Sequence, residues 1–365
     1  MKARAAVQIG ARTIELQRLA VPDDLGDDEA LIAVEGTGMC GTDWEQYQGH
    51  LAARVPYPVI PGHETVGRIA ALGPMARARW GLEAGARVAV ESTRPCGACP
   101  ACRSGRWLYC AERTIYGLTT ATDRPALSGG FAEYLVLRSN SRVYPVPDHL
   151  STEDAVFFNP LGAGMDWGVR LAGTEPGDTV VVVGPGQRGL ACLLAVRDAG
   201  ADQVVVVGRG RRPWRLELAR ALGASAVVDS DATPVVDAVL AATGGRAVDR
   251  VIDTTPTALG PVLAATELLR PEGTLVLAAH KTGEIPATLF TERLLAKALT
   301  VRGAYSVSPW AKTEAIRLLA DQTYDLTELH SHTVDIAELD RALRTLGGET
   351  DGDRALHITV TAGHD

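Results

Sequence analysis

The sequence predicts an α/β protein with two domains, one strand-rich and irregular, the other a doubly wound parallel sheet. Its 365 residues suffice for two hydrophobic cores, and 46% of them are hydrophobic. The first 150 residues or so contain short β-type runs broken by Gly and Pro, whereas from Asp178 onward Val-rich runs alternate with amphipathic stretches. Continuous apolar runs are typical of strands buried on both faces, so the second pattern indicates a parallel sheet covered by helices.

The elements follow in chain order. Strands of the first domain are predicted at residues 30–34, 66–71, 87–90 and 131–137, where long helical periodicity is scarce. In the second domain, strands are predicted at 179–183, 203–207, 226–228, 248–252 and 274–278, and helices at 189–199 and 214–222. The alternation stops near Gly303, and the tail, with stretches at 311–319, 339–346 and 355–360, could return to either domain.

Composition and charge exclude several classes of protein. The net charge is −8, without the basic surface that a nucleic-acid binder needs. No apolar stretch at the N-terminus resembles a signal peptide, and no apolar run approaches the length that spans a membrane. Clustered cysteines without a secretion signal indicate a reducing compartment and a metal rather than disulfides, so the expected location is the cytoplasm.

Four clustered cysteines form a C-x2-C-x2-C-x7-C pattern: Cys96, Cys99, Cys102 and Cys110. Gly and Pro between them allow the loop to turn all four thiolates toward one point. Zinc takes four thiolates tetrahedrally, and such closed sites are structural rather than catalytic. Disulfides are the alternative, but cysteines three residues apart form strained loops, and the other two cysteines lie far away in the sequence.

A dinucleotide site is predicted where the first strand of the second domain ends. The run G-x-G-x-x-G comprises Gly184, Gly186 and Gly189, with Gln187 and Arg188 between the last two, and leads directly into a helix. The first glycine permits the turn, the second allows close approach to a pyrophosphate, and the third allows the helix to pack on the strand. The helix N-terminus then offers free N–H groups to the anion.

The end of the next strand favours NADP(H) over NAD(H). An acidic residue there would bind the ribose hydroxyls and repel a 2′-phosphate, but the chain has Gly208, Arg209, Arg211 and Arg212. Glycine leaves room, and guanidinium groups pair well with phosphate. The alternative is a solvated basic loop without a role in binding.

Two further segments could supply a second metal site. Cys40, Thr42 and Asp43 lie in the segment GMCGTD, and His63 and Glu64 lie in PGHE. Alone, these could be a core cysteine and a surface His–Glu pair. Together with the cysteine loop and the glycine-rich turn, in this order, they resemble the zinc-dependent alcohol dehydrogenases of the medium-chain dehydrogenase/reductase superfamily.

The resemblance implies a GroES-like catalytic domain at residues 1–155 and 304–365, a Rossmann domain at 156–303, and catalysis in the cleft between them. It also implies that Cys40 and His63 bind a catalytic zinc, with Glu64 at or near the metal. Asp43 would orient the histidine, and Thr42 would hydrogen-bond the substrate oxygen. Zinc lowers the pKa of a bound alcohol, and the nicotinamide takes the hydride.

The chain departs from the family pattern at two positions. The third protein ligand is usually Cys, Glu or Asp, but Asn159 occupies its position, so Glu64 or water would complete the shell, or Asn159 would hydrogen-bond the bound water. Asp166 is a less favoured alternative ligand. The family's relay histidine is replaced by Glu45, which could pass the proton itself, or the proton could leave through water.

These observations favour a zinc-dependent oxidoreductase that uses NADP(H) on an alcohol or carbonyl substrate. One alternative is an NAD-dependent polyol, sugar or amino-alcohol dehydrogenase; another is a non-catalytic, cofactor-binding regulatory or structural protein with a degraded metal site. A homodimer or homotetramer is expected from the family. Large aromatic residues could line a pocket for a bulky substrate or serve core packing: Trp44, Phe158, Trp167 and Trp310.

Overall fold

The computed structural model describes residues 1–119, 127–256, 258–279, 281, 291–350 and 354–363. The chain forms two compact units, the first comprising Met1–Phe158 and Leu326–Asp365 and the second Asn159–Asp325. Within the described ranges, no helix is both long enough and apolar enough to cross a membrane.

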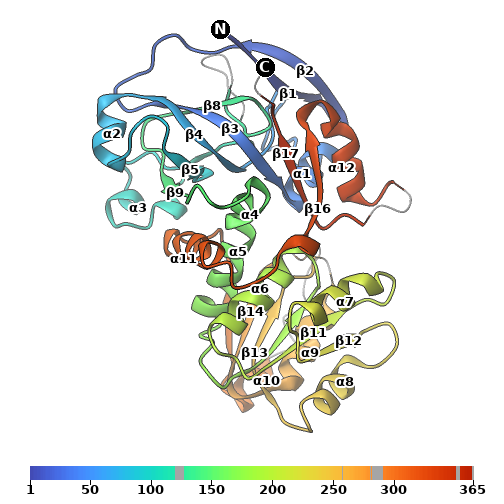
Figure 1. Ribbon diagram of the computed structural model, residues 1–365. Coiled ribbons are helices and arrows are strands. Elements are labelled where there is room, and N and C mark those ends of the chain that lie inside the picture. The colour runs from blue at the N-terminus through green and yellow to red at the C-terminus, as the bar shows by residue number, and fades with distance from the viewer. Residues whose placement is uncertain (120–126, 257, 280, 282–290, 351–353, 364–365) are drawn as a thin grey trace. The chain divides into compact units, whose positions relative to one another are not determined.

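The first unit is built on a seven-stranded sheet (Figure 1). Its strands are β3 (Ala30–Met39), β4 (Glu64–Leu72), β5 (Arg87–Val90), β8 (Tyr134–Leu137), β9 (Val143–Pro145), β16 (His330–Asp335) and β17 (His357–Thr361). They follow the order β16-β17-β3-β4-β5-β9, and β8 pairs with β3. Two smaller pairs accompany the sheet: β1 (Lys2–Gly10) with β2 (Thr13–Ala20), and β6 (Thr93–Arg94) with β7 (Thr114–Ile115).

The helices of this unit are short. They are α1 (Gly41–Gln48), α2 (Pro74–Trp80), α3 (Pro100–Arg103), α4 (Thr152–Val156) and α12 (Leu339–Gly347), with 3-10 turns η1 (Trp107–Tyr109), η4 (Thr327–Leu329) and η5 (Ile336–Glu338). The amphipathic α12 buries Leu339 and Leu343 in one cluster with Ile358 and Val360 of β17. The end of the chain is therefore part of the core of the first unit.

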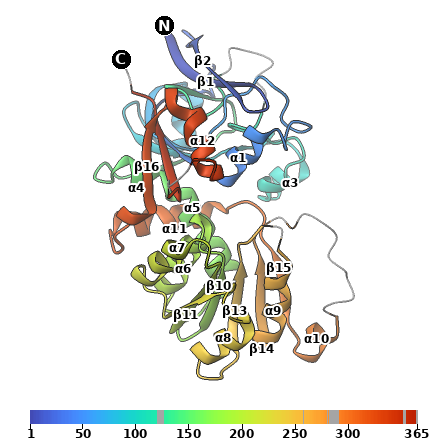
Figure 2. The same ribbon diagram turned by 90° about the vertical axis from the view of Figure 1, so that its right-hand side faces the viewer.

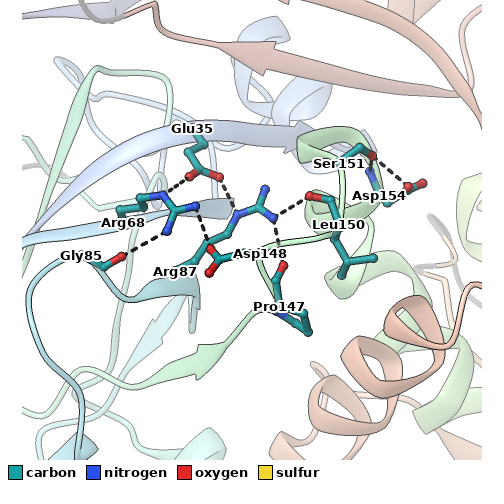
Figure 3. A network of polar contacts seen from close by, with 9 residues as sticks. All are labelled: Glu35, Arg68, Gly85, Arg87, Pro147, Asp148, Leu150, Ser151 and Asp154. Atoms are coloured by element: carbon teal, nitrogen blue, oxygen red, sulfur yellow. Dashed lines mark hydrogen bonds and ion pairs between the residues drawn. The ribbon is translucent and has the colours of Figure 1, made fainter.

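A buried arginine fixes the segment between β9 and α4 (Figure 3). The Arg87 side chain is 4% exposed and forms an ion pair with Glu35 at 2.6 Å. It also donates hydrogen bonds to the carbonyls of Pro147 at 3.1 Å and Leu150 at 2.6 Å. Arg68 forms an ion pair with the other oxygen of Glu35 at 2.9 Å, but its side chain is 43% exposed. The network anchors the chain just before it leaves the first unit.

The second unit is a six-stranded parallel sheet (Figure 2). Its strands are β10 (Thr179–Val183), β11 (Gln203–Gly208), β12 (Ala226–Asp229), β13 (Val248–Asp253), β14 (Leu269–Leu277) and β15 (Thr300–Gly303). They follow the order β12-β11-β10-β13-β14-β15, and every adjacent pair is parallel. These parallel pairs confirm the predicted sheet. The valines of β10 and β11 are buried, as expected for strands covered on both faces.

Helices cover both faces of this sheet. They are α5 (Phe158–Gly164), α6 (Gln187–Asp198), α7 (Pro213–Ala221), α8 (Val235–Ala242), α9 (Gly260–Leu268), α10 (Thr291–Ala296) and α11 (Pro309–Ala320), with a π-helical segment η2 (Met165–Leu171). Val181 and Val251 lie in one cluster with residues of α8 and α9. The neighbouring Ile252 faces α6 and η2, where Gly168 lies close to its side chain. The sheet is therefore doubly wound.

The unit boundary differs from the sequence prediction. Residues 304–365 were expected to rejoin the first domain, but residues 304–325 group with the second unit and only Leu326–Asp365 with the first. The reason is the contact between α11 and η2. The Ser308 hydroxyl, which caps α11, donates a hydrogen bond to the buried Asp166 at 2.7 Å.

Candidate active site

The first unit places Cys40 where β3 ends and α1 begins. Its Sγ accepts a hydrogen bond from the Thr42 backbone N–H at 3.3 Å, and the Asp43 carboxylate accepts one from the Cys40 N–H at 2.9 Å. This is a capping box in which a thiol takes the place of the usual hydroxyl. The cap holds the buried sulfur in a fixed direction at the end of the strand.

The pairing of β3 with β4 brings His63 and Glu64 to the same place. Gly38 lies opposite Glu64 in the antiparallel register, so the residues just beyond each strand end are neighbours. The Sγ of Cys40 lies 3.1 Å from Nε2 of His63. One ligand atom from each of Cys40, His63 and Glu64 lies within 4.8 Å of the others, and both Cys40 and Glu64 are buried.

Asp43 lies on the other side of the histidine ring. Its Oδ1 lies 3.3 Å from Nδ1 of His63, and its side chain is fully buried. Burial by itself lowers the pKa of His63, but the Cys40 thiolate and the Asp43 carboxylate outweigh it and raise that pKa well above 6.5. Two negative groups thus stabilise a cation at this point. The same two groups would stabilise a bound zinc ion.

These residues fit a zinc ion. A thiolate at about 2.3 Å and an imidazole at about 2.0 Å from one zinc are about 3.5 Å apart in tetrahedral geometry. The separation of Cys40 and His63, 3.1 Å, is close to that value. Soft sulfur, imidazole and one carboxylate form a typical donor set for a catalytic zinc. In the described part of the chain, the only other such group of donors is the cysteine loop.

The other predicted residues near this site have separate surroundings. Thr42 is half-buried in the first turn of α1. Glu45 is exposed and forms an ion pair with Nδ1 of His50 at 2.6 Å. Sequence reasoning missed His50, which lies just beyond the end of α1 and returns to Glu45 only because Gly49 turns the chain. The ring of Trp44 packs against Gly347, where a methyl group would be 2.4 Å from it.

The alternative ligand Asp166 is already engaged. Its carboxylate forms an ion pair with Arg170 at 2.5 Å and accepts hydrogen bonds from Ser308. Because it is 1% exposed and holds η2 to the start of α11, its role is structural. Asn159, 8% exposed, lies in α5 of the second unit. The backbone carbonyl of Asn159 accepts a hydrogen bond from the Arg188 guanidinium at 2.9 Å.

The four loop cysteines converge as their spacing predicts. Their sulfurs lie within 4.8 Å of one another, with Cys99 and Cys102 at 3.5 Å and Cys96 and Cys102 at 3.9 Å. Four thiolates around one zinc are about 3.8 Å apart, whereas a disulfide requires about 2.0 Å. A hydrogen bond from the Cys102 backbone lowers the pKa of Cys99 to about 7, whereas burial and the neighbouring thiols raise the pKa of Cys102 to about 12. The loop therefore fits a structural zinc.

The glycine-rich turn has the geometry of a dinucleotide site. Gly184 has a φ of 102°, and Gly186 is the N-cap of α6. A Cβ on Gly189 would lie 1.8 Å from the carbonyl oxygen of Gly184, so the helix reaches the strand only because that residue is glycine. Gln187 begins α6, and its Nε2 is buried without a hydrogen-bond partner among the described residues. The turn offers N–H groups to a phosphate.

The basic segment after β11 differs in detail from the expectation. Gly208 does not leave space, because a Cβ there would lie 2.5 Å from the ring of Pro185. The Arg209 side chain is 61% exposed and forms an ion pair with Asp231 at 3.1 Å. Arg211 and Arg212 are exposed. Arg215, which sequence reasoning missed, lies beside Gly186 in the next helix.

Comparison with known proteins identifies the family. Residues 26–148 match the model of the alcohol dehydrogenase GroES-like domain, and residues 189–321 match that of the zinc-binding dehydrogenases. The chain belongs to the zinc-dependent alcohol dehydrogenases of the medium-chain dehydrogenase/reductase superfamily. It is thus an oxidoreductase of the zinc-binding type with a GroES-like domain and a Rossmann domain, acting on alcohols or polyols with a nicotinamide cofactor.

Particular relatives agree with this assignment. A Mycobacterium tuberculosis protein assigned as an alcohol dehydrogenase is 41% identical over 98% of both chains. Sorbitol dehydrogenase of Bacillus subtilis is 34% identical over 72% of this chain and 71% of its own. The solved structure of a Sinorhizobium meliloti protein, assigned as a zinc-binding dehydrogenase and bound to NADP, is 27% identical over 99% of both chains, with a TM-score of 0.85. The family gives no support to a non-catalytic role.

Proposed function

We propose that the protein is an NADP(H)-dependent alcohol dehydrogenase or carbonyl reductase whose reaction takes place at Cys40, His63 and Glu64. The observation that carries the proposal is the convergence of these three donors within 4.8 Å, on a chain that also has a glycine-rich dinucleotide turn. When bound, zinc would polarise the substrate oxygen, and the nicotinamide would accept or donate the hydride.

The chain's own residues would hold and prepare this site. Cys40 and His63 would bind the metal, and Asp43 would fix the histidine ring through Nδ1, 3.3 Å away. Glu64 would lie at or near the metal and could supply a carboxylate oxygen to it. The Thr42 hydroxyl would hydrogen-bond the substrate oxygen and begin the proton path, accepting the alcohol proton as it passes its own proton on. Glu45, paired with His50 at 2.6 Å, would carry the proton to solvent.

The proposal is tested by zinc content together with turnover. The purified chain is expected to contain about two zinc ions, and Cys40→Ser is expected to retain one while losing turnover on a panel of alcohols and aldehydes with NADPH. Cys192→Ser is the matched control, because that cysteine is buried in α6 among apolar residues. A Cys40→Ser variant that keeps two zinc ions and full turnover would refute the proposal.

A second candidate is an NAD-dependent polyol or sugar dehydrogenase. The likeness to sorbitol dehydrogenase favours it. Assays of sorbitol and related polyols with NAD and NADP separate the two candidates. An NAD-dependent polyol dehydrogenase is expected to turn these substrates over faster with NAD than with NADP.

We infer also that the chain forms a dimer along β15. This strand lies at the edge of its sheet, pairs within the described residues with β14, and has all four residues exposed, among them Val301 at 44%. An exposed edge strand readily pairs with a second copy. Light scattering is expected to give twice the chain mass, and Val301→Lys is expected to give a monomer; an unchanged dimer in that variant contradicts this interface.

A further inference from the structure

Arg215 lies beside the turn that is expected to hold the cofactor's phosphates. It belongs to the first turn of α7, and its Nη1 lies 3.9 Å from the point that a Cβ on Gly186 would occupy. Apart from Gly186 and its two chain neighbours, no other atom of the described residues comes within 4 Å of that point. Outside the turn itself, the guanidinium is thus the side-chain group nearest to that point.

The same region adjoins the end of β11, where the adenosine ribose of a dinucleotide lies. A Cβ on Gly208 would lie 2.5 Å from Pro185 of the turn and 2.9 Å from Leu216 of α7. The turn, the end of β11 and the start of α7 therefore meet at one point. Arg215 occupies this junction, so a group on the 2′ position of the ribose falls within reach of its side chain.

The charges at this junction favour an anion. Burial, together with the neighbouring guanidinium groups of Arg212 and Arg211, lowers the pKa of Arg215 to about 10. An anion bound between these groups would relieve that repulsion. Arg209 is different, because its guanidinium is paired with Asp231 and its side chain is 61% exposed.

We propose that Arg215 binds the 2′-phosphate of NADP(H) and is the residue that selects this cofactor over NAD(H). The inference rests on the NADP(H) preference proposed above. Arg211 and Arg212 add positive charge from the solvent side, while Arg209 contributes little because Asp231 holds it. The glycine at position 208 serves a different purpose, which is to let Pro185 pack against the end of the strand.

The test compares the binding of 2′,5′-ADP and 5′-AMP, which differ only in the 2′-phosphate, by calorimetry. A charge-assisted contact of this kind contributes about 10- to 100-fold in affinity. Arg215→Gln is expected to weaken 2′,5′-ADP binding by that factor and to change 5′-AMP binding less than about threefold. Arg215→Lys keeps the charge but not the planar fork, so it is expected to be intermediate.

Matched variants separate the possible outcomes. Arg220→Gln, the same change at an exposed position of α7, is expected to alter neither affinity. If the unmodified protein does not prefer 2′,5′-ADP, the NADP(H) proposal fails. If it does and Arg215→Gln keeps the preference, or if Arg215→Gln weakens both ligands equally, the role of Arg215 is overturned while the NADP(H) proposal stands.

Discussion

Replacing Arg87 by Met is expected to destabilise the connection between β9 and α4 far more than the same change at Arg68. Both arginines bind Glu35, so the two variants lose a similar charge and keep a long apolar stem (Figure 3). They differ in burial, since the side chains are 4% and 43% exposed. Arg87 also donates hydrogen bonds to the backbone carbonyls of Pro147 and Leu150, and the second of these hydrogen bonds is buried.

The magnitude follows from these contacts. Removing one partner of a buried ion pair costs about 3–5 kcal/mol, and a buried carbonyl left without a donor costs about 1–3 kcal/mol. These terms overlap, so we expect about 3–5 kcal/mol for Arg87→Met. An exposed ion pair contributes about 0–1 kcal/mol, and the second partner of Arg68, Asp148, is 76% exposed. Arg68→Met is therefore expected to stay below about 1 kcal/mol.

Hydrogen exchange measured on peptides that contain residues 146–150 reports this difference locally. The Val146 N–H donates to the carbonyl of Arg87 at 3.0 Å, so its protection depends on the network. Since about 1.4 kcal/mol is tenfold, its exchange is expected to speed up on the order of 100-fold or more in Arg87→Met. The same exchange rate in the Arg87 and Arg68 variants would refute the reasoning.

Three further predictions concern the cysteine loop, the loss of stability at low pH and the proton path. Cys99→Ser is expected to lower the melting temperature and to remove one of two zinc ions while the other stays, because a structural site contributes folding energy. Asp154→Asn is expected to lower stability at pH 7, because a hydrogen bond from His330 at 2.9 Å lowers the pKa of Asp154 from 3.8. That contribution is present above the unfolded pKa and is lost as the pH falls through the lower folded pKa, so the variant and the parent converge below about pH 4. Glu45→Gln is expected to lower kcat about tenfold with KM little changed, and His50→Gln to lower it less.

Each of these has a clear contrary result. For the loop, unchanged melting and two zinc ions in Cys99→Ser would count against a structural metal. For Asp154, urea midpoints of variant and parent that differ equally at pH 7 and pH 3 would contradict the linkage. For Glu45, a pH profile of kcat identical to that of the parent would exclude it from the proton path.

Much of this arrangement follows from local sequence. The spacing of Cys96 to Cys110 predicts convergent thiols because the loop is short and its glycines, such as Gly97 with a φ of 80°, permit the turns. The G-x-G-x-x-G motif is equally local, since it requires only the strand before it and the helix after it. The buried parallel strands were predictable because continuous Val-rich runs are typical of strands that are covered on both faces.

What the sequence does not reveal depends on contacts between distant segments. Arg215 lies 29 residues after Gly186, and only the return of α7 to the turn makes them neighbours. The packing of Pro185 on Gly208 also depends on that return, which is why the glycine was first interpreted as open space. The boundary predicted near residue 304 differs from that of the compact units for a similar reason, because the contact of Ser308 with Asp166 spans 142 residues.

The position of β17 has a consequence for how the protein matures. This strand follows the second unit in the sequence, and it lies between β16 and β3 rather than at the edge of its sheet. A ribosome must therefore synthesise the segment that follows the second unit before the first unit is complete, whereas Asn159–Asp325 has all of its strands earlier. During synthesis, the second unit is expected to fold first, while residues 37–39 of β3 lack the partner that β17 later supplies.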